Sequence, residues 1–436
     1  MPVSWSIAAE WEQLDAGSPE ERACFSALGI KAHDLWLTEG NDVLANRLRQ
    51  APLLSAYHLA EWLAWNWWRL RWEPRSNSKD WAYAHRLTTI GSGYIWPNLT
   101  IFSDGERTAL ISKPTTERPQ TPFRYITDHA VILPASEFEA GIDLFLSQVL
   151  ERLSWAGIED SNLQTVWSGV IAERKTPAFV RTRKLEALLG QDPDSQEQLV
   201  DQLVRDIEDL GLSGVEELAA EHGQSGKLLT GDDLREAAQR SGFDASPRDV
   251  IRLPATEVPK RSGLTPAYRA GATAARALRE HHRLGEGPLT DVQLAEMAGV
   301  VRAIIPDVRG GASISFALDE KPTQGRVVLR SKWRTGRRFE LARLLGDRLA
   351  RPPSGALLPA TRAYTYRQKV QRSFAAELLS PFEVVDAMLG DDYSMENQQD
   401  VAEHFEVSPL TIRTLLVNHG RLAREGLETE FETAAA

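Results

Sequence analysis

Hydrophobic residues recur at helical spacing over long parts of the chain and alternate with polar residues over a few short ones. The first helical stretches are predicted at residues 19–28 and 53–72. Ser18 and Ser55 stand just before them or at their first turn, where a hydroxyl can accept a hydrogen bond from a free backbone N–H. Both serines are therefore predicted to be N-caps.

Two stretches of strand-like sequence, residues 94–102 and 107–112, lie on either side of Ser-Asp-Gly-Glu and predict a β-hairpin. The same N-terminal part contains ten of the thirteen tryptophans. Several of those between Trp62 and Trp72 share a helical stripe, which is more often core or interface than a surface for stacking bases. We expect residues 1–132 to form a Trp-rich α+β domain.

The remaining chain divides into a helical middle region at 133–258, a mixed region at 259–425 and a tail at 426–436. Prolines between 247 and 266 mark the start of the mixed region. Within it, two strands followed by two helices are predicted at 313–318, 326–330, 338–349 and 368–379. Ser136 and Thr230 are expected to cap helices of the middle region. The expected fold class is α+β, predominantly helical.

Composition narrows the class of protein. With one cysteine, Cys24, the chain cannot form an internal disulfide or a cysteine-based zinc cluster. The most apolar stretch, residues 51–72, is interrupted by charged and polar side chains, so no membrane partner is expected. The N-terminus shows no basic region before an apolar run, so no secretory signal is visible and a cytoplasmic location is expected.

Two segments carry a resemblance to a known family. Residues 337–342, Arg-Arg-Phe-Glu-Leu-Ala, and residues 374–381, Phe-Ala-Ala-Glu-Leu-Leu-Ser-Pro, resemble the ImmA/IrrE family of metallo-endopeptidases, over roughly residues 263–420. The resemblance implies a C-terminal zincin-fold domain, which would end in the helix-turn-helix-like segment at 400–416. It also implies a role in bacterial stress regulation or phage defence, with a helix-turn-helix repressor or another protein as partner.

The chain departs from that family at the residues that do the chemistry. In an HExxH helix two histidines hold zinc and the glutamate acts as base. The matching positions here are Arg343, Leu344 and Asp347, and the third ligand falls at Gln368, with Gln371 next if the register slips. A guanidinium cannot bind zinc and leucine cannot take a proton. We therefore expect a pseudoenzyme with no catalytic residue, metal or cofactor.

Arg343 and Asp347 are four residues apart and share a helical face. Either an ion pair between them fills the space of the metal, or they form a solvated surface pair. A residual zinc-dependent endopeptidase that cleaves a helix-turn-helix regulator is the catalytic alternative. A non-catalytic protein would keep the substrate groove for docking, with an extended partner strand added to an exposed edge of the small sheet.

The net charge of −11 conceals an asymmetry. Residues 326–372 contain thirteen basic and two acidic residues, whereas residues 192–236 contain thirteen acidic and three basic ones. Either the basic segment pairs with acidic groups of this chain or of a protein partner, or it binds nucleic acid, which makes a DNA-binding protein a further alternative. The candidate surface residues are Arg330, Lys332, Arg334, Arg337, Arg338, Arg348 and Arg351.

Overall fold

The computed structural model describes residues 5–116, 121–254, 263–350 and 355–423. The chain divides into two compact units. Unit 1 comprises Met1–Asp201, His222–Gly226 and Ala363–Thr365, and unit 2 comprises Gln202–Glu221, Lys227–Arg362 and Tyr366–Ala436. The helical middle region, residues 133–258, is thus shared between the units. Its predicted end at residue 258 and the predicted tail, residues 426–436, lie outside the described residues.

Unit 1 contains three small antiparallel sheets, of strand orders β1-β2-β3 with β6 on β2, β10-β8-β7, and β5-β4-β9. The strands are β1 (Trp5–Trp11), β2 (Phe25–Ala32), β3 (Leu35–Trp36), β4 (Gly40–Asp42), β5 (Arg47–Arg49), β6 (Leu53–Ser55), β7 (Asn98–Ser103), β8 (Arg107–Lys113), β9 (Phe123–Tyr125) and β10 (His129–Pro134). The helices are α1 (Pro19–Ala23), α2 (Ala56–Trp65), α3 (Trp67–Trp72), α4 (Trp81–His85), η1 (Leu87–Thr89), α5 (Ala135–Trp155), α6 (Asn162–Arg174), α7 (Pro177–Leu188) and the start of α8 (Glu197–Leu210).

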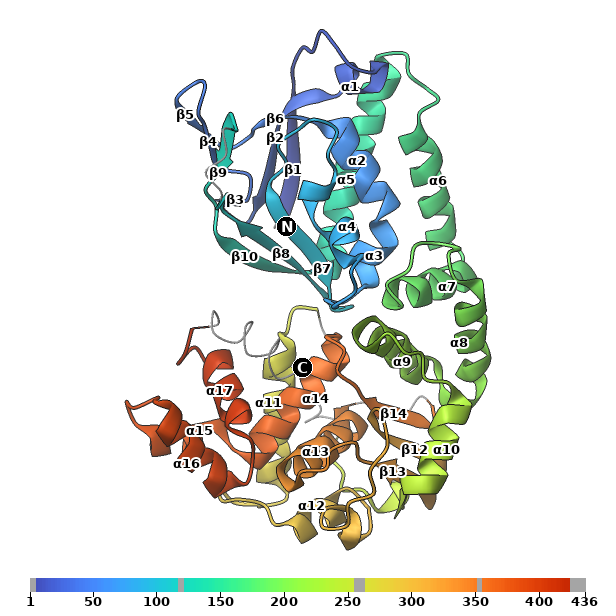
Figure 1. Cartoon of the computed structure of the whole chain (residues 1–436), viewed down its shortest axis with the longest axis vertical. Helices are drawn as coiled ribbons and strands as arrows, with labels where there is room; N and C mark the ends of the chain where they lie inside the picture. The colour runs from blue at the N-terminus through green and yellow to red at the C-terminus, as the bar shows by residue number, and fades with distance from the viewer. Residues whose placement is uncertain (1–4, 117–120, 255–262, 351–354, 424–436) are drawn as a thin grey trace. The chain divides into compact units, whose positions relative to one another are not determined.

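Helices α2 and α5 pack on the sheet of β1 and β2 and form the core of unit 1 with it (Figure 1). Trp67 and Trp68 are buried in this core, at 4% exposure each, so these two tryptophans serve packing rather than stacking. The predicted hairpin is confirmed as β7 and β8, whose register pairs Ser103 with Thr108.

Ser18 and Ser55 are confirmed as N-caps, since their hydroxyls accept from the backbone N–H of Glu21 and His58. The helix predicted at 19–28 is wrong beyond Ala23, because the following residues pair in the sheet as β2. The helix predicted at 53–72 begins at Ala56, since Leu53–Ser55 pairs with β2, and it is interrupted at Asn66.

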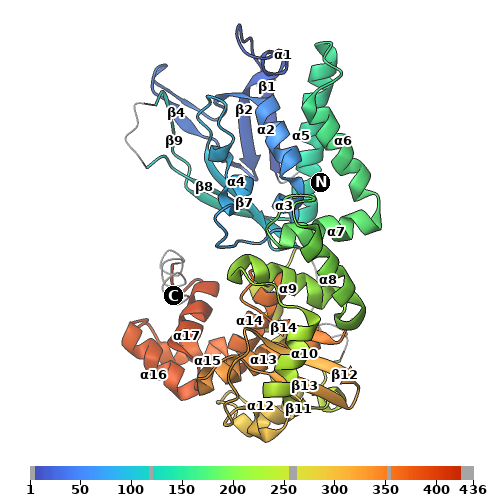
Figure 2. The ribbon, with the colours of Figure 1, turned by 45° about the vertical axis from the view of Figure 1, so that its right-hand side comes forward.

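Unit 2 is built around an antiparallel sheet of order β11-β13-β12-β14 (Figure 2). Its strands are β11 (Phe243–Ala245), β12 (Ser315–Lys321), β13 (Gln324–Val328) and β14 (Leu357–Ala360). Its helices are the rest of α8, then α9 (Leu212–Ser225, whose last four residues belong to unit 1), α10 (Gly231–Ser241), η2 (Pro247–Asp249), α11 (Ala267–His281), α12 (Asp291–Met297), η3 (Arg302–Ile304), α13 (Arg334–Ala350), α14 (Tyr366–Leu379), α15 (Phe382–Leu389), α16 (Met395–Phe405) and α17 (Pro409–Asn418).

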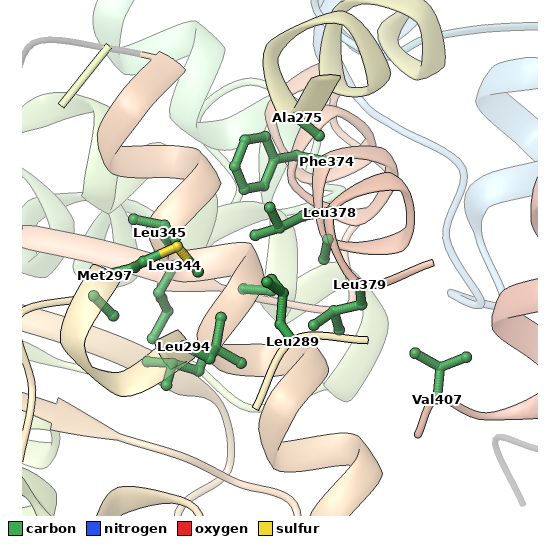
Figure 3. Close-up of a cluster of buried hydrophobic side chains, with 14 of the residues drawn as sticks. Ala275, Leu289, Leu294, Met297, Leu344, Leu345, Phe374, Leu378, Leu379 and Val407 are labelled. Carbon is green, nitrogen blue, oxygen red and sulfur yellow. The ribbon is translucent and has the colours of Figure 1, made fainter. Parts of the chain in front are cut away.

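The core of unit 2 lies where α11, α13 and α14 meet (Figure 3). Phe374 and Leu378 of α14 lie in one buried cluster with Ala275 of α11 and Leu345 of α13. The close approach of α11 and α14 needs a glycine, because a Cβ on Gly271 would lie 2.4 Å from the carbonyl oxygen of Val370. This packing fixes the two helices that carry the candidate site, α13 and α14.

The four elements predicted for the mixed region are present with shifted ends, as β12, β13, α13 and α14. Thr230 is confirmed as a capping-box residue, but Ser136 is not an N-cap, because α5 starts one residue earlier behind Pro134. Strands β11 and β14 were not predicted. Across the described ranges, no helix is long and apolar enough to cross a membrane.

Candidate functional site between helices α13 and α14

Three of the four residues at the degenerate motif come together at the interface of α13 and α14. Arg343 and Asp347 lie one turn apart on the face of α13 that meets Gln368 of α14. The inclusion of Leu344 in the site was wrong, because this side chain lies in the hydrophobic core with Met297 and Leu294 (Figure 3). One residue along a helix turns the side chain by roughly 100°, away from the face of Arg343.

Asp347 pairs with Arg367 of α14 rather than with Arg343. The Nε and Nη2 atoms of Arg367 lie 2.7 and 2.5 Å from the two carboxylate oxygens, and Nη1 donates to the carbonyl of Ser213 at 2.7 Å. Asp347 is 2% exposed, so the predicted solvated pair is also wrong. Burial by itself lowers the pKa of Arg367, but the Asp347 carboxylate outweighs burial and raises that pKa overall. Arg367 is therefore charged in the folded protein.

Arg343 is a buried guanidinium held by neutral acceptors. Its Nη2 atom donates to the side-chain oxygen of Gln368 and to the carbonyl of Thr361, at 2.6 Å each. Burial, aided by the nearby charge of Arg372, lowers the pKa of Arg343 to about 9. That value leaves the group charged at neutral pH. The Nε atom of Arg343 is buried without a hydrogen-bond partner.

Gln368 also binds backbone groups along the outer edge of strand β14. Its amide oxygen accepts from the backbone N–H of Thr361 at 2.9 Å, and its amide nitrogen donates to the carbonyl of Pro359 at 3.0 Å. Gln371 donates to the same carbonyl at 3.0 Å. A glutamate could not make both contacts, because an ionised carboxylate only accepts.

At both outer strands of the unit 2 sheet, some described backbone groups are already bound. At β14 the carbonyl of Pro359 and the adjacent N–H of Thr361, two groups that a partner strand would use, are bound by Gln368 and Gln371. At β11 the backbone around Ala245 bonds to residues 299–301, including a bridge to Val300. The expectation that a partner pairs with an exposed edge stays a prediction, although α14 and the 299–301 loop already take some of the hydrogen bonds that it would need.

The side chains at this site are not suited to bind a zinc ion. Arg343 is a cation, both oxygens of Asp347 accept from Arg367, and the oxygen of Gln368 accepts from Arg343 and Thr361. Zinc in proteins takes anionic or imidazole ligands that carry no competing cation. Within the ranges that the structure describes, no three His, Cys, Asp or Glu side chains cluster as a metal site would require.

The basic segment is largely bound within unit 2. Arg337 and Arg338 were predicted on a binding surface, and this was wrong, because both are 0% exposed. Arg337 donates to the backbone carbonyls of Ile304, Ile305 and Asp307. Arg338 binds Asp291, Glu406 and the carbonyl of Leu289. Both arginines position the loops around α13.

The other predicted contact residues differ in what they touch. Arg348 makes a two-point contact with Asp319, and the half-exposed Arg334 pairs with Asp291 and Glu406. Arg330 is exposed and lies 3.6 Å from Glu340. Lys332 is exposed and has no ion-pair partner among the described residues, and Arg351 lies outside them. The acidic segment at 192–236 also contributes, because its Glu221 pairs with Arg362 of the basic segment.

The helix-turn-helix-like segment is formed by α16 and α17. Glu406, at the position where a turn glycine is usual, has a left-handed backbone with φ of 55°. The face of α17 that would read bases in such a motif comprises Thr411, Arg413, Thr414 and Asn418. Thr411 is 7% exposed, and Glu406 in the preceding turn binds Arg334 and Arg338. This face is therefore partly used for packing within unit 2.

A pH test follows from Asp291. Burial by itself raises the pKa of Asp291, but hydrogen bonds from Arg334 and Arg338 outweigh it and hold that pKa below its usual range. A lowered folded-state pKa stabilises the fold above the unfolded value of roughly 3.9 and ceases to do so as pH falls through the folded one. Asp291→Asn should thus lower the free energy of unfolding at pH 7, and by a smaller amount at pH 3. Urea denaturation of both proteins measures this, and a loss of equal size at both pH values would contradict it.

Sequence reasoning missed the partners that hold the site. Arg367 was counted in the basic segment, but nothing in the sequence indicated that it faces Asp347, because the two lie on different helices 20 residues apart. Comparisons with protein-family models, with curated proteins and with solved structures find no match for this chain.

Proposed function

We propose that unit 2 is a degenerate ImmA/IrrE-like domain of zincin fold, and that the protein binds a protein partner without cleaving it. The proposal is carried by one observation. The positions that would hold the metal ligands are occupied by Arg343, Asp347 and Gln368, and all three are used in hydrogen bonds across α13 and α14. These hydrogen bonds hold the two helices together, at positions where the related enzymes would need free metal ligands and a general base.

A protein partner is favoured over nucleic acid by the state of the basic segment. Most of its described arginines are buried or bound to carboxylates, which leaves few charges to contact phosphates. An exposed aromatic side chain is available instead. Trp333 is 79% exposed, next to the exposed Lys332, and Val308 is 50% exposed.

Arg337 fixes the geometry of this Trp333 surface, which we define as Val308, Lys332 and Trp333. Its guanidinium donates to carbonyls in the loop before Val308 and to the carbonyl of Ser331. Its own backbone N–H donates to the carbonyl of Trp333. Exposed tryptophans beside a basic group are typical anchors of protein interfaces. The family resemblance suggests a helix-turn-helix regulator as the partner, in bacterial stress regulation or phage defence.

The test is co-purification from native cells with matched tryptophan variants. We expect the wild type and Trp155→Ala, a variant at an 88% exposed tryptophan of unit 1, to retain the same protein. Trp333→Ala should weaken binding of that protein roughly thirtyfold, the equivalent of about 2 kcal/mol for an anchor residue. Retention of the protein by Trp333→Ala at wild-type affinity would rule out this surface.

Two further measurements address the alternatives. Stoichiometric zinc that a chelator removes together with a peptidase activity would support the residual endopeptidase. Retardation of duplex DNA that falls steeply with salt, and that the exposed-site variant Arg330→Glu/Lys332→Glu abolishes, would support DNA binding. The buried Arg337 and Arg338 are unsuitable for this test, since their reversal would disrupt folding.

A further inference from the structure

Helix α11 and the residues at and just after the C-terminal end of α17 line an open pocket of about 500 Å³ in unit 2, away from the α13–α14 site. Its walls are polar and basic: Tyr268, Arg269, Thr273, Arg276, Asn418 and His419. No carboxylate belongs to the described residues that line it. The volume lies in the range of small-molecule sites and is larger than one inorganic anion requires.

Two guanidinium groups of the pocket keep donors available. Arg276 gives its Nε to Glu377 at 2.9 Å, and no described acceptor takes its two terminal nitrogens. Arg269 gives its Nε to the hydroxyl of the adjacent Tyr268 at 3.1 Å and has no carboxylate partner in the described ranges. Guanidiniums with available Nη atoms on the wall of one pocket match the oxygens of a phosphate.

The backbone around the pocket also favours an anion. The first turn of α11, which holds Tyr268 and Arg269, contains no acidic residue and no side-chain cap. Its positive dipole end is therefore not neutralised locally. At the other wall, the carbonyls of the last turn of α17 already accept from backbone N–H groups of residues 419–421. Their negative dipole end is correspondingly weakened.

The pocket also offers ring surface beside its charges. His419 stacks on Phe382 with ring centroids 3.6 Å apart, which fixes the orientation of the imidazole. Burial and the charge of Arg276 lower the pKa of His419, so the ring is neutral at pH 7 and the positive charge comes from the two arginines. Tyr268 supplies a second, half-buried ring.

We infer that this pocket binds a phosphorylated small molecule of mononucleotide size. The phosphate would lie between Arg269 and Arg276, with Thr273 and Asn418 as further hydrogen-bonding groups. The remainder of the ligand would lie against Tyr268 and His419. This inference is independent of the proposed protein partner, since no residue of the Trp333 surface lines the pocket.

The test is calorimetric titration of the full-length protein with AMP, adenosine and inorganic phosphate. We expect AMP to bind, adenosine to bind at least tenfold more weakly, and inorganic phosphate to bind more weakly than AMP. Arg269→Glu should weaken AMP binding at least tenfold, because it replaces a phosphate donor by a repelling charge. Arg302→Glu makes the same charge change at an exposed side chain outside the pocket and should leave AMP binding unchanged.

Three results would overturn the inference. If AMP does not bind, the pocket does not take this class of ligand. AMP binding that survives Arg269→Glu places the ligand elsewhere. Equal affinity for AMP and inorganic phosphate means that the pocket holds an anion without recognising the rest of the molecule.

Discussion

Replacing Asp347 by alanine should lower the free energy of unfolding of unit 2 by about 3–5 kcal/mol. Asp347 is 2% and Arg367 is 6% exposed, and they make a two-point contact at 2.7 and 2.5 Å. Without the carboxylate, a buried guanidinium keeps only the carbonyl of Ser213 among these contacts. An uncompensated buried charge costs far more than a lost surface pair. Urea denaturation followed by circular dichroism measures the change.

Two further variants separate the charge effect from a general loss of packing. Glu296→Ala breaks a surface pair with Arg302, whose side chains are 54% and 70% exposed, and should change stability by less than about 1 kcal/mol. Asp347→Leu combined with Arg367→Met removes both charges and should recover much of the loss. If the double variant is as unstable as Asp347→Ala, the cost does not arise from the unpaired arginine.

From this ion pair we expect that changing the motif alone would not restore a zinc site. A histidine at position 347 would leave Arg367 unpaired, and a glutamate at position 344 would place a charge in the hydrophobic core. A glutamate at position 368 would lose the donor that binds Pro359. The present residues therefore support one another, and any metal-binding variant would need changes in α14 and around β14 as well.

The parts of the fold that local sequence determines were predictable. Ser18, Ser55 and Thr230 act within one turn of helix, so their capping roles follow from short spacings. Helices α13 and α14 were found because their apolar residues repeat over several turns. Even here the chain broke the expected helix at Asn66, whose side-chain amide donates to the carbonyl of Trp62.

The missed features depend on contacts between distant residues. Strands β11 and β14 are short, three and four residues long, and are defined by pairing with β13 and β12. Their sequences carry too few positions for alternation to be visible. The charge of Arg337 suggested a surface residue, whereas backbone carbonyls near residue 305 bury it. A charge count reveals an excess but not which of its members face inward.

Gly271→Ala should destabilise unit 2 by about 3 kcal/mol or more, although alanine is the better helix former. The added Cβ would lie 2.4 Å from the carbonyl oxygen of Val370 and 2.7 Å from the backbone nitrogen of Phe374. Both atoms belong to the backbone of α14 and cannot be moved aside by a rotamer change. Relief requires α11 and α14 to separate, which opens the cluster around Phe374. Urea denaturation measures the loss.

Alanine substitutions at two other glycines should change stability to different extents, depending on which atoms the new methyl group would contact. At Gly346 the nearest atoms belong to the side chain of Phe374, 2.4 Å away, so Gly346→Ala should cost less than Gly271→Ala, because a ring can shift. At Gly169, inside α6, nothing lies within 4 Å, and Gly169→Ala should stabilise its helix by roughly 0.5–1 kcal/mol. If Gly271→Ala stabilised the protein as Gly169→Ala should, α11 and α14 could not approach so closely. The packing of α14 against α11 would then need a different account.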